Sequence, residues 1–161
     1  MSRHLSRTSA PASLLDVRAQ PFSDTIVVGA IAASATTGAL LAMGHRAGRA
    51  LTPFAAIGAV PFHQTDIGFA GLVLAGALLH VIGMFVWAFV FVWLAERTKQ
   101  PVVTAIVVAA VNFLMSWLFT WATGRGIGTV LPFGDRVLFA VILAGAYVAG
   151  MRYALPASRA A

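Results

Sequence analysis

The sequence predicts an all-α, polytopic membrane protein built as a bundle of four transmembrane helices, and three observations predict it. Hydrophobic residues make up 60% of the 161 residues and charged residues only 10%, whereas an ordinary soluble domain has about 25% charged residues. Four apolar stretches are long enough to cross a hydrocarbon core, which takes about 20 helical residues. The charged residues fall almost entirely between them. The predicted spans are residues 25–43, 68–95, 101–123 and 137–153.

The first span follows a largely polar segment, residues 1–24, which we expect to form a tail outside the membrane. No small-residue cleavage site follows a short apolar core, so we expect this span to remain as a helix and not to be removed as a signal peptide. The span is crowded with small residues, among them Gly29 and Ala33 one turn apart. Small residues let helix backbones approach closely in lipid. We therefore expect the first helix to pack against its neighbours.

The longest predicted connection, residues 44–67, is partly apolar. Pro53 and Pro61 interrupt any long helix there, and Phe54 and Phe62 are suited to anchoring at the depth of the lipid headgroups. We expect this outer loop to rest in the membrane interface. A docking surface for a partner is the alternative.

The second span carries a lone histidine, His80, close to its centre. An imidazole in hydrocarbon needs a partner, and the first interpretation is a hydrogen bond to a neighbouring helix, with Asn112 or a backbone carbonyl as acceptor. The alternative is an axial ligand to haem or bacteriochlorophyll. Gly76-x-x-x-His80 resembles the small-x-x-x-His pattern by which light-harvesting polypeptides ligate bacteriochlorophyll magnesium. Gly76 also offers a small packing surface one turn from the histidine.

The third span begins at Pro101, which suits the first turn of a helix, and the short connection before it predicts an antiparallel hairpin with the second span. Asn112, Ser116 and Thr120 recur every fourth residue and form a polar stripe on one helical face. We expect these side chains to form interhelical hydrogen bonds. The path of a small uniporter or channel is the alternative, although the stripe has no ionisable group.

The five acidic residues lie outside the centres of the spans. Asp24, Asp66 and Asp135 each stand just ahead of an apolar run, where a carboxylate can cap a helix N-terminus and offset its dipole. A proton- or sodium-coupled transporter normally places acidic residues inside the membrane. The chain has no cysteine and no second histidine at the depth of His80. We therefore expect no catalytic residue and no metal site.

The chain contains a hint of internal duplication. The segment Pro61-Phe62 with Asp66 and then Val73-Leu74-Ala75-Gly76-Ala77 is echoed by Pro132-Phe133 with Asp135 and then Ile142-Leu143-Ala144-Gly145-Ala146, and the two five-residue runs are offset by 69 positions. Two spans per unit would give the copies parallel orientations. Chance is the alternative, because membrane helices draw on few residue types.

The 11 basic residues are scattered through the tails and loops and form no stripe that could follow phosphates, so we expect no nucleic-acid partner. Their distribution predicts that both termini, including a C-terminal tail of residues 154–161, are cytoplasmic. On that side lie Arg3, Arg7, Arg18, Arg97, Lys99, Arg152 and Arg159, against Arg46, Arg49, Arg125 and Arg136 on the other. The expected partners are membrane lipids and other integral membrane subunits.

Taken as a whole, the chain resembles the uncharacterised four-helix bacterial inner-membrane proteins of the YagU-like type. The resemblance rests on the small-residue first helix, on Leu78-Leu79-His80 followed by Phe85-Val86-Trp87, and on the terminal helix from Gly145 to Tyr153. It implies the architecture and a multi-pass location in the bacterial inner membrane, and no activity. The predicted function is that of a non-catalytic accessory or scaffolding subunit of a larger membrane complex.

Overall fold

The computed structural model of the chain describes residues 14–62 and 64–159, and it describes side chains for residues 22–62 and 67–154. Within these ranges the chain is helical and contains no strand, which confirms the all-α fold. The elements are α1 (Leu14–Arg46), α2 (Thr52–Gly58), α3 (Gln64–Thr98), α4 (Pro101–Thr123), the 3-10 turn η1 (Ile127–Thr129) and α5 (Phe133–Arg159).

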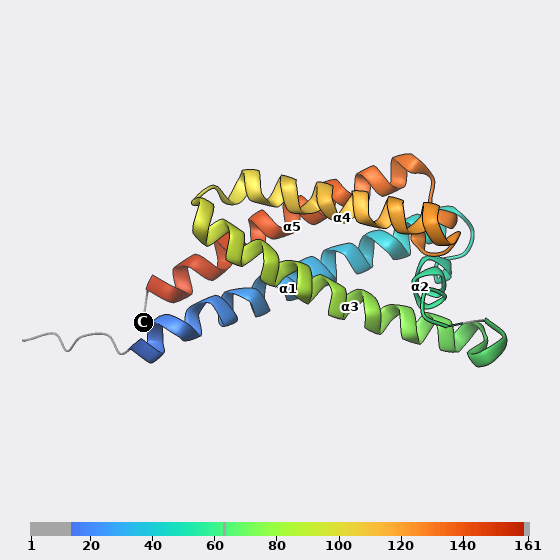
Figure 1. Cartoon of the computed structure of the whole chain (residues 1–161), viewed down its shortest axis with the longest axis horizontal. Helices are drawn as coiled ribbons and strands as arrows, with labels where there is room; N and C mark the ends of the chain where they lie inside the picture. The colour runs from blue at the N-terminus through green and yellow to red at the C-terminus, as the bar shows by residue number, and fades with distance from the viewer. Residues whose placement is uncertain (1–13, 63, 160–161) are drawn as a thin grey trace, which may run out of the picture.

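Four of these helices are long and apolar enough to cross a membrane, over Phe22–Arg46, Ile67–Thr98, Pro101–Thr123 and Phe133–Ala154. By length and composition the chain is therefore a multi-pass membrane protein. The four helices lie side by side, and α2 lies across one end of the bundle, at the right in Figure 1. The beginning of α1 and the end of α5 lie together at the opposite end (Figure 1).

The packing order follows from which helices touch. The first helix packs mainly on α5 and α3, while α4 packs on α5 and less closely on α3. One cluster of buried side chains joins α1, α3, α4 and α5 around Phe91 and Tyr147, and a second joins α1, α2 and the segment after η1 around Leu40 and Phe54. Helix α4 is the most peripheral of the four long helices, because only 22% of its most apolar stretch is buried.

The helices extend further than the predicted spans at both ends of the chain. Residues 14–24 of the predicted polar tail are helical, because α1 begins at Leu14; residues 1–13 lie outside the described part. The predicted tail 154–161 is likewise helical up to Arg159. Hydropathy marks the part of a helix that lipid surrounds, whereas backbone hydrogen bonding continues through polar residues until something interrupts it.

The predicted outer loop 44–67 does not simply rest on lipid. It contains α2, whose buried residues include Pro53 and Phe54, and α2 packs against α3. The two helices touch through glycines, since a Cβ added to Gly58 would overlap the Leu72 carbonyl oxygen and one added to Gly76 would overlap the Phe54 carbonyl oxygen. The expectation that Phe54 anchors in the headgroups is therefore wrong. Phe62 remains exposed.

The three acidic residues expected to cap helices have different positions. Asp24 lies well inside α1 and cannot be its N-cap, because the helix begins ten positions earlier at Leu14. Asp66 precedes Gly68, whose φ of 67° interrupts α3, and its side chain lies outside the described part. Asp135 lies in the first turn of α5, where its carboxylate accepts a hydrogen bond from Arg46 at the end of α1.

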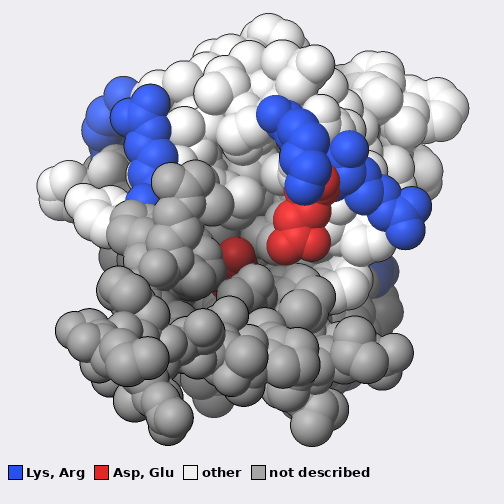
Figure 2. All heavy atoms as spheres, turned by 90° about the vertical axis from the view of Figure 1, so that its left-hand side faces the viewer, with Lys and Arg blue, Asp and Glu red and all other residues white. Residues whose placement is uncertain are grey.

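The connection between α3 and α4 is as short as the sequence predicts. Only Lys99 and Gln100 separate the helices, and Lys99 takes the left-handed conformation with φ 57°. The hydroxyls of Thr98 and Thr104 lie 2.9 Å apart across the turn, and Pro101 begins α4. Figure 2 looks at this end of the molecule and shows basic side chains on two of its sides, with acidic side chains between them.

Candidate functional site

His80 lies in the bundle where α1, α2, α3 and α5 meet, and only 5% of its surface is exposed. Its Nε2 atom is 3.0 Å from the hydroxyl oxygen of Thr36 on α1. That hydroxyl also lies 2.6 Å from the carbonyl oxygen of Ala32, to which it donates its proton. The hydroxyl oxygen is therefore the acceptor, and Nε2 of His80 is the donor. The hydrogen bond to a neighbouring helix is present, but its partner is Thr36 and not Asn112.

Two aromatic rings enclose the imidazole. Phe54 of α2 lies edge-on with its centroid 5.8 Å from that of His80, and Phe139 of α5 lies at 6.3 Å in a similar arrangement. An axial ligand must present a bare ring nitrogen to a tetrapyrrole plane with room on that side. Here Nε2 donates its proton to Thr36, which leaves Nδ1 as the bare nitrogen, but only 5% of the residue is exposed, so the protein leaves no room for a tetrapyrrole plane beside the ring. The residues present do not fit haem or bacteriochlorophyll at His80.

The predicted polar stripe of α4 faces α5 and η1 without forming a path. Asn112 and Ser116 line a cavity of about 30 Å³ together with Arg136 of α5, which is room for about one water molecule. Thr120 donates to the Ser116 carbonyl of its own helix, 2.9 Å away, and packs against Gly128 of η1. These contacts are typical of helix packing in membranes.

Gly29 and Ala33 occupy contact positions on α1. A Cβ added to Gly29 would overlap the ring of Phe85 on α3, and Ala33 is buried in the cluster around Phe91. Gly150 of α5 gives the matching contact on the other side, since a Cβ there would lie 2.9 Å from the Cα of Val28. Small residues therefore set the distances from α1 to both α3 and α5.

The large concave surface of the transmembrane part is a groove between α4 and α5 on the outside of the bundle. It consists of two adjoining hollows of about 380 and 760 Å³ that share Ile106, Val141 and Ala144. Its floor is mostly alanine and glycine. Lining residues are Val102, Ala105, Ile106, Ala109, Ala110, Phe113, Phe133, Val137, Ala140, Val141, Ala144, Gly145, Val148, Ala149, Arg152 and Tyr153. We call this surface the α4–α5 groove.

Among the described residues, no three histidine or acidic side chains come close enough together to bind a metal ion. The side chain of Tyr147 is completely buried and stacks on Phe91 with ring centroids 4.8 Å apart. No described group bonds its hydroxyl. A substrate has no access to it, so its role is packing.

Two features were not predicted from the sequence. Thr36 was not expected as the partner of His80, although both lie near the centres of their spans and a threonine hydroxyl is a suitable acceptor. The α4–α5 groove was not expected either. The signal was present in the small residues Ala105, Ala109, Ala140 and Ala144, spaced so that they share a helix face.

No protein-family model, curated protein or solved structure matches this chain. The resemblance to YagU-like proteins stays a prediction.

Proposed function

We propose that this chain is a non-catalytic subunit of a larger complex in the bacterial inner membrane, and that it binds a transmembrane helix of its partner in the α4–α5 groove. The observation that carries the proposal is the extent of this groove. Phe133 and Tyr153 line its two ends, and helical rise places them about 30 Å apart, the thickness of the hydrocarbon core. A single acyl chain reaches only about half of that, whereas a transmembrane helix fills it.

The floor of the groove has the composition of a helix contact. Ala109, Ala144 and Gly145 have small side chains or none, and such residues allow the close backbone approach that drives association where lipid supplies no hydrophobic effect. In the part of the chain that the structure describes, polar side chains are absent from the central part of the groove. The interior of the bundle, in contrast, is filled by its own side chains around Phe91 and Tyr147. Binding along the outside fits this construction better than transport through the middle.

The two similar segments point to the same surface. In the first segment, α2 packs in backbone contact against Gly76. Gly145 holds the corresponding place in the second segment, and nothing lies within 4 Å of the position that its Cβ would take. The chain covers the first of these glycines with its own helix and leaves the second open. A partner helix at Gly145 would take the place that α2 takes at Gly76.

The test is photocrosslinking in native membranes from a benzophenone amino acid at Ala110, which lies in the groove, with Ile82 on the lipid-facing side of α3 as the reference position. We expect a discrete adduct with a second membrane protein from Ala110 and only lipid adducts from Ile82. Gly145→Leu should lower the yield of that adduct about tenfold, because overpacking a helix contact costs about 1–3 kcal/mol.

Gly83→Leu is the matched control. Gly83 lies in α3, a Cβ there also meets nothing within 4 Å, and it does not line the groove. Its adduct yield should equal that of the wild type. Equal losses in both variants, or only lipid adducts from Ala110, would overturn the proposal. An adduct of twice the mass of the chain would show self-association in place of an accessory role.

A further inference from the structure

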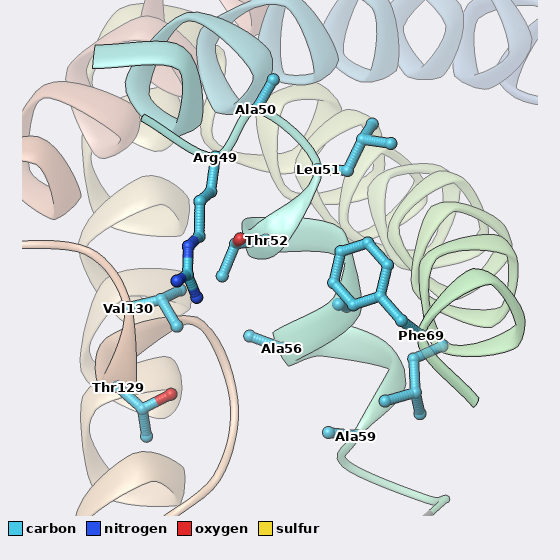
Figure 3. A pocket seen from close by; sticks show the side chains of 11 residues that line it. Arg49, Ala50, Leu51, Thr52, Ala56, Ala59, Phe69, Thr129 and Val130 are labelled. Carbon is cyan, nitrogen blue, oxygen red and sulfur yellow. The ribbon is translucent and has the colours of Figure 1, made fainter. Parts of the chain in front are cut away.

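A second open cavity lies at the end of the bundle where α2 lies, remote from the α4–α5 groove. Its volume is about 690 Å³, and its walls come from the connection after α1, from α2, from the beginning of α3 and from η1. One side of the cavity is polar and the opposite side is apolar. Figure 3 shows the guanidinium of Arg49 extending past Thr52 toward Val130, while Phe69 and Leu51 stand on the opposite side.

The charge of this cavity comes from Arg49. Among the described residues no hydrogen bond or ion pair engages its guanidinium, and no acidic side chain lines the cavity. Arg46, one turn earlier in the sequence, already binds Asp135. The hydroxyl-bearing residues Thr52 and Thr129 line the same cavity, and the Thr129 hydroxyl already donates to the Gly126 carbonyl oxygen. A guanidinium with available donors next to hydroxyls favours a ligand with a phosphate or carboxylate group.

The volume of the cavity and its apolar walls indicate that the ligand also has a sizeable apolar part. A cavity of about 690 Å³ falls in the range of about 300–1,000 Å³ that holds a whole organic ligand, and a free inorganic ion would leave most of it empty. Ala55, Ala56 and Ala59 of α2 and Phe69 and Leu72 of α3 form the apolar part. Phe69 is also 49% exposed, so the apolar side of the cavity is open to its surroundings.

We propose that this cavity binds an anionic phospholipid of the surrounding membrane, with its phosphate on Arg49 and the first part of an acyl chain against Ala59 and Phe69. The cavity lies at one end of the four long apolar helices, which is where a bilayer around them would have its headgroups. Arg49 also lines a smaller neighbouring cavity of about 190 Å³ with Thr52 and Val130. The headgroup beyond the phosphate therefore has further space next to Arg49.

The experiment is native mass spectrometry of the full chain taken from nanodiscs that contain equal amounts of phosphatidylglycerol and phosphatidylcholine. The wild type should retain phosphatidylglycerol in preference to phosphatidylcholine. Arg49→Gln should lower that preference about fivefold, because a charge-assisted hydrogen bond at a partly exposed site is lost. Ala59→Trp keeps the charge and fills the apolar part, so it should lower the retention of both lipids.

Arg125→Gln is the matched control, since it removes one positive charge from the same end of the molecule but does not line the cavity. It should keep the preference of the wild type. An equal loss in Arg125→Gln and Arg49→Gln would mean that net charge alone selects the lipid, and it would overturn the site. Full competition by inorganic phosphate or by free fatty acid would also overturn it. A circular-dichroism melt of each variant shows whether it folds, and Ala59→Trp tests the cavity even if Arg49→Gln does not fold.

Discussion

At the scale of single residues, the hydrogen bond between His80 and Thr36 joins α3 to α1 near the middle of their apolar spans. Nε2 donates to the Thr36 hydroxyl oxygen at 3.0 Å. Thr36→Val keeps the shape of the side chain and removes the acceptor, so the imidazole N–H loses its partner in a medium without water. We expect unfolding in detergent to show a loss of about 1 kcal/mol, within the range measured for such contacts between membrane helices.

A double-mutant cycle with His80→Ala separates this bond from simple packing. If the two residues act through it, the coupling energy should be about 0.5–1.5 kcal/mol. Strictly additive effects would contradict the bond. Thr120→Val is a suitable comparison, because the Thr120 hydroxyl bonds only within its own helix, to the Ser116 carbonyl, and its loss should cost less.

Tyr147 gives a second prediction at this scale. Its hydroxyl is buried without a described partner, while its ring stacks on Phe91 at an interplanar angle of 9°. Tyr147→Phe keeps the stack and removes an unsatisfied polar group, so the free energy of unfolding should stay equal or rise by up to about 1–2 kcal/mol. Tyr147→Ala should lower it by about 3–5 kcal/mol, because a cavity replaces the ring. A loss from Tyr147→Phe similar to that from Tyr147→Ala would show that the hydroxyl has a bound partner.

At the scale of elements, the position of α2 depends on two glycines. Gly76→Ala would place a methyl group against the Phe54 carbonyl oxygen. Neither group is the end of a flexible side chain, so α2 must shift, at a cost of about 1–3 kcal/mol or more. Gly83→Ala is the control, because its methyl group meets nothing within 4 Å.

The shift of α2 can be followed through a single introduced cysteine, because the natural chain contains none. Ala56 is only 9% exposed, and a cysteine at this position should react slowly with maleimide in the wild-type background. Combined with Gly76→Ala, it should react at least about tenfold faster, as a side chain does when local packing opens by about 1.4 kcal/mol. An unchanged rate would show that α2 tolerates the methyl group without moving.

At the scale of the whole molecule, the prediction concerns orientation. The beginning of α1, the α3–α4 connection and the end of α5 lie at one end of the bundle (Figure 1), and the excess of lysine and arginine predicts that this end is cytoplasmic. In intact cells, a cysteine at Gln100 should resist a membrane-impermeant maleimide, and one at Pro132 at the other end should react. The reverse pattern would invert the topology and would place the Arg49 cavity in the cytoplasmic leaflet.

The sequence determined what could be read from solvent preference and from local backbone chemistry. Long apolar runs require lipid and helical hydrogen bonding, so the all-α fold, the four spans and the start of α4 at Pro101 follow from composition and order alone. It also identified Gly76 as a small packing residue. The predictions that Asp24 caps a helix and that the polar ends of the chain are non-helical tails were wrong, because hydropathy does not mark where a helix begins or ends.

The tertiary structure alone decided which surfaces meet. Helix packing in a membrane depends on the rotation of each helix about its axis, which is set by all its neighbours together and not by any one stretch of sequence. For that reason the sequence did not predict that His80 bonds to Thr36 and not to Asn112, or that Phe54 is buried in the bundle and not at the membrane interface. For the same reason the Arg49 cavity, whose walls come from α2, α3, η1 and the connection after α1, could be found only after the helices were in place.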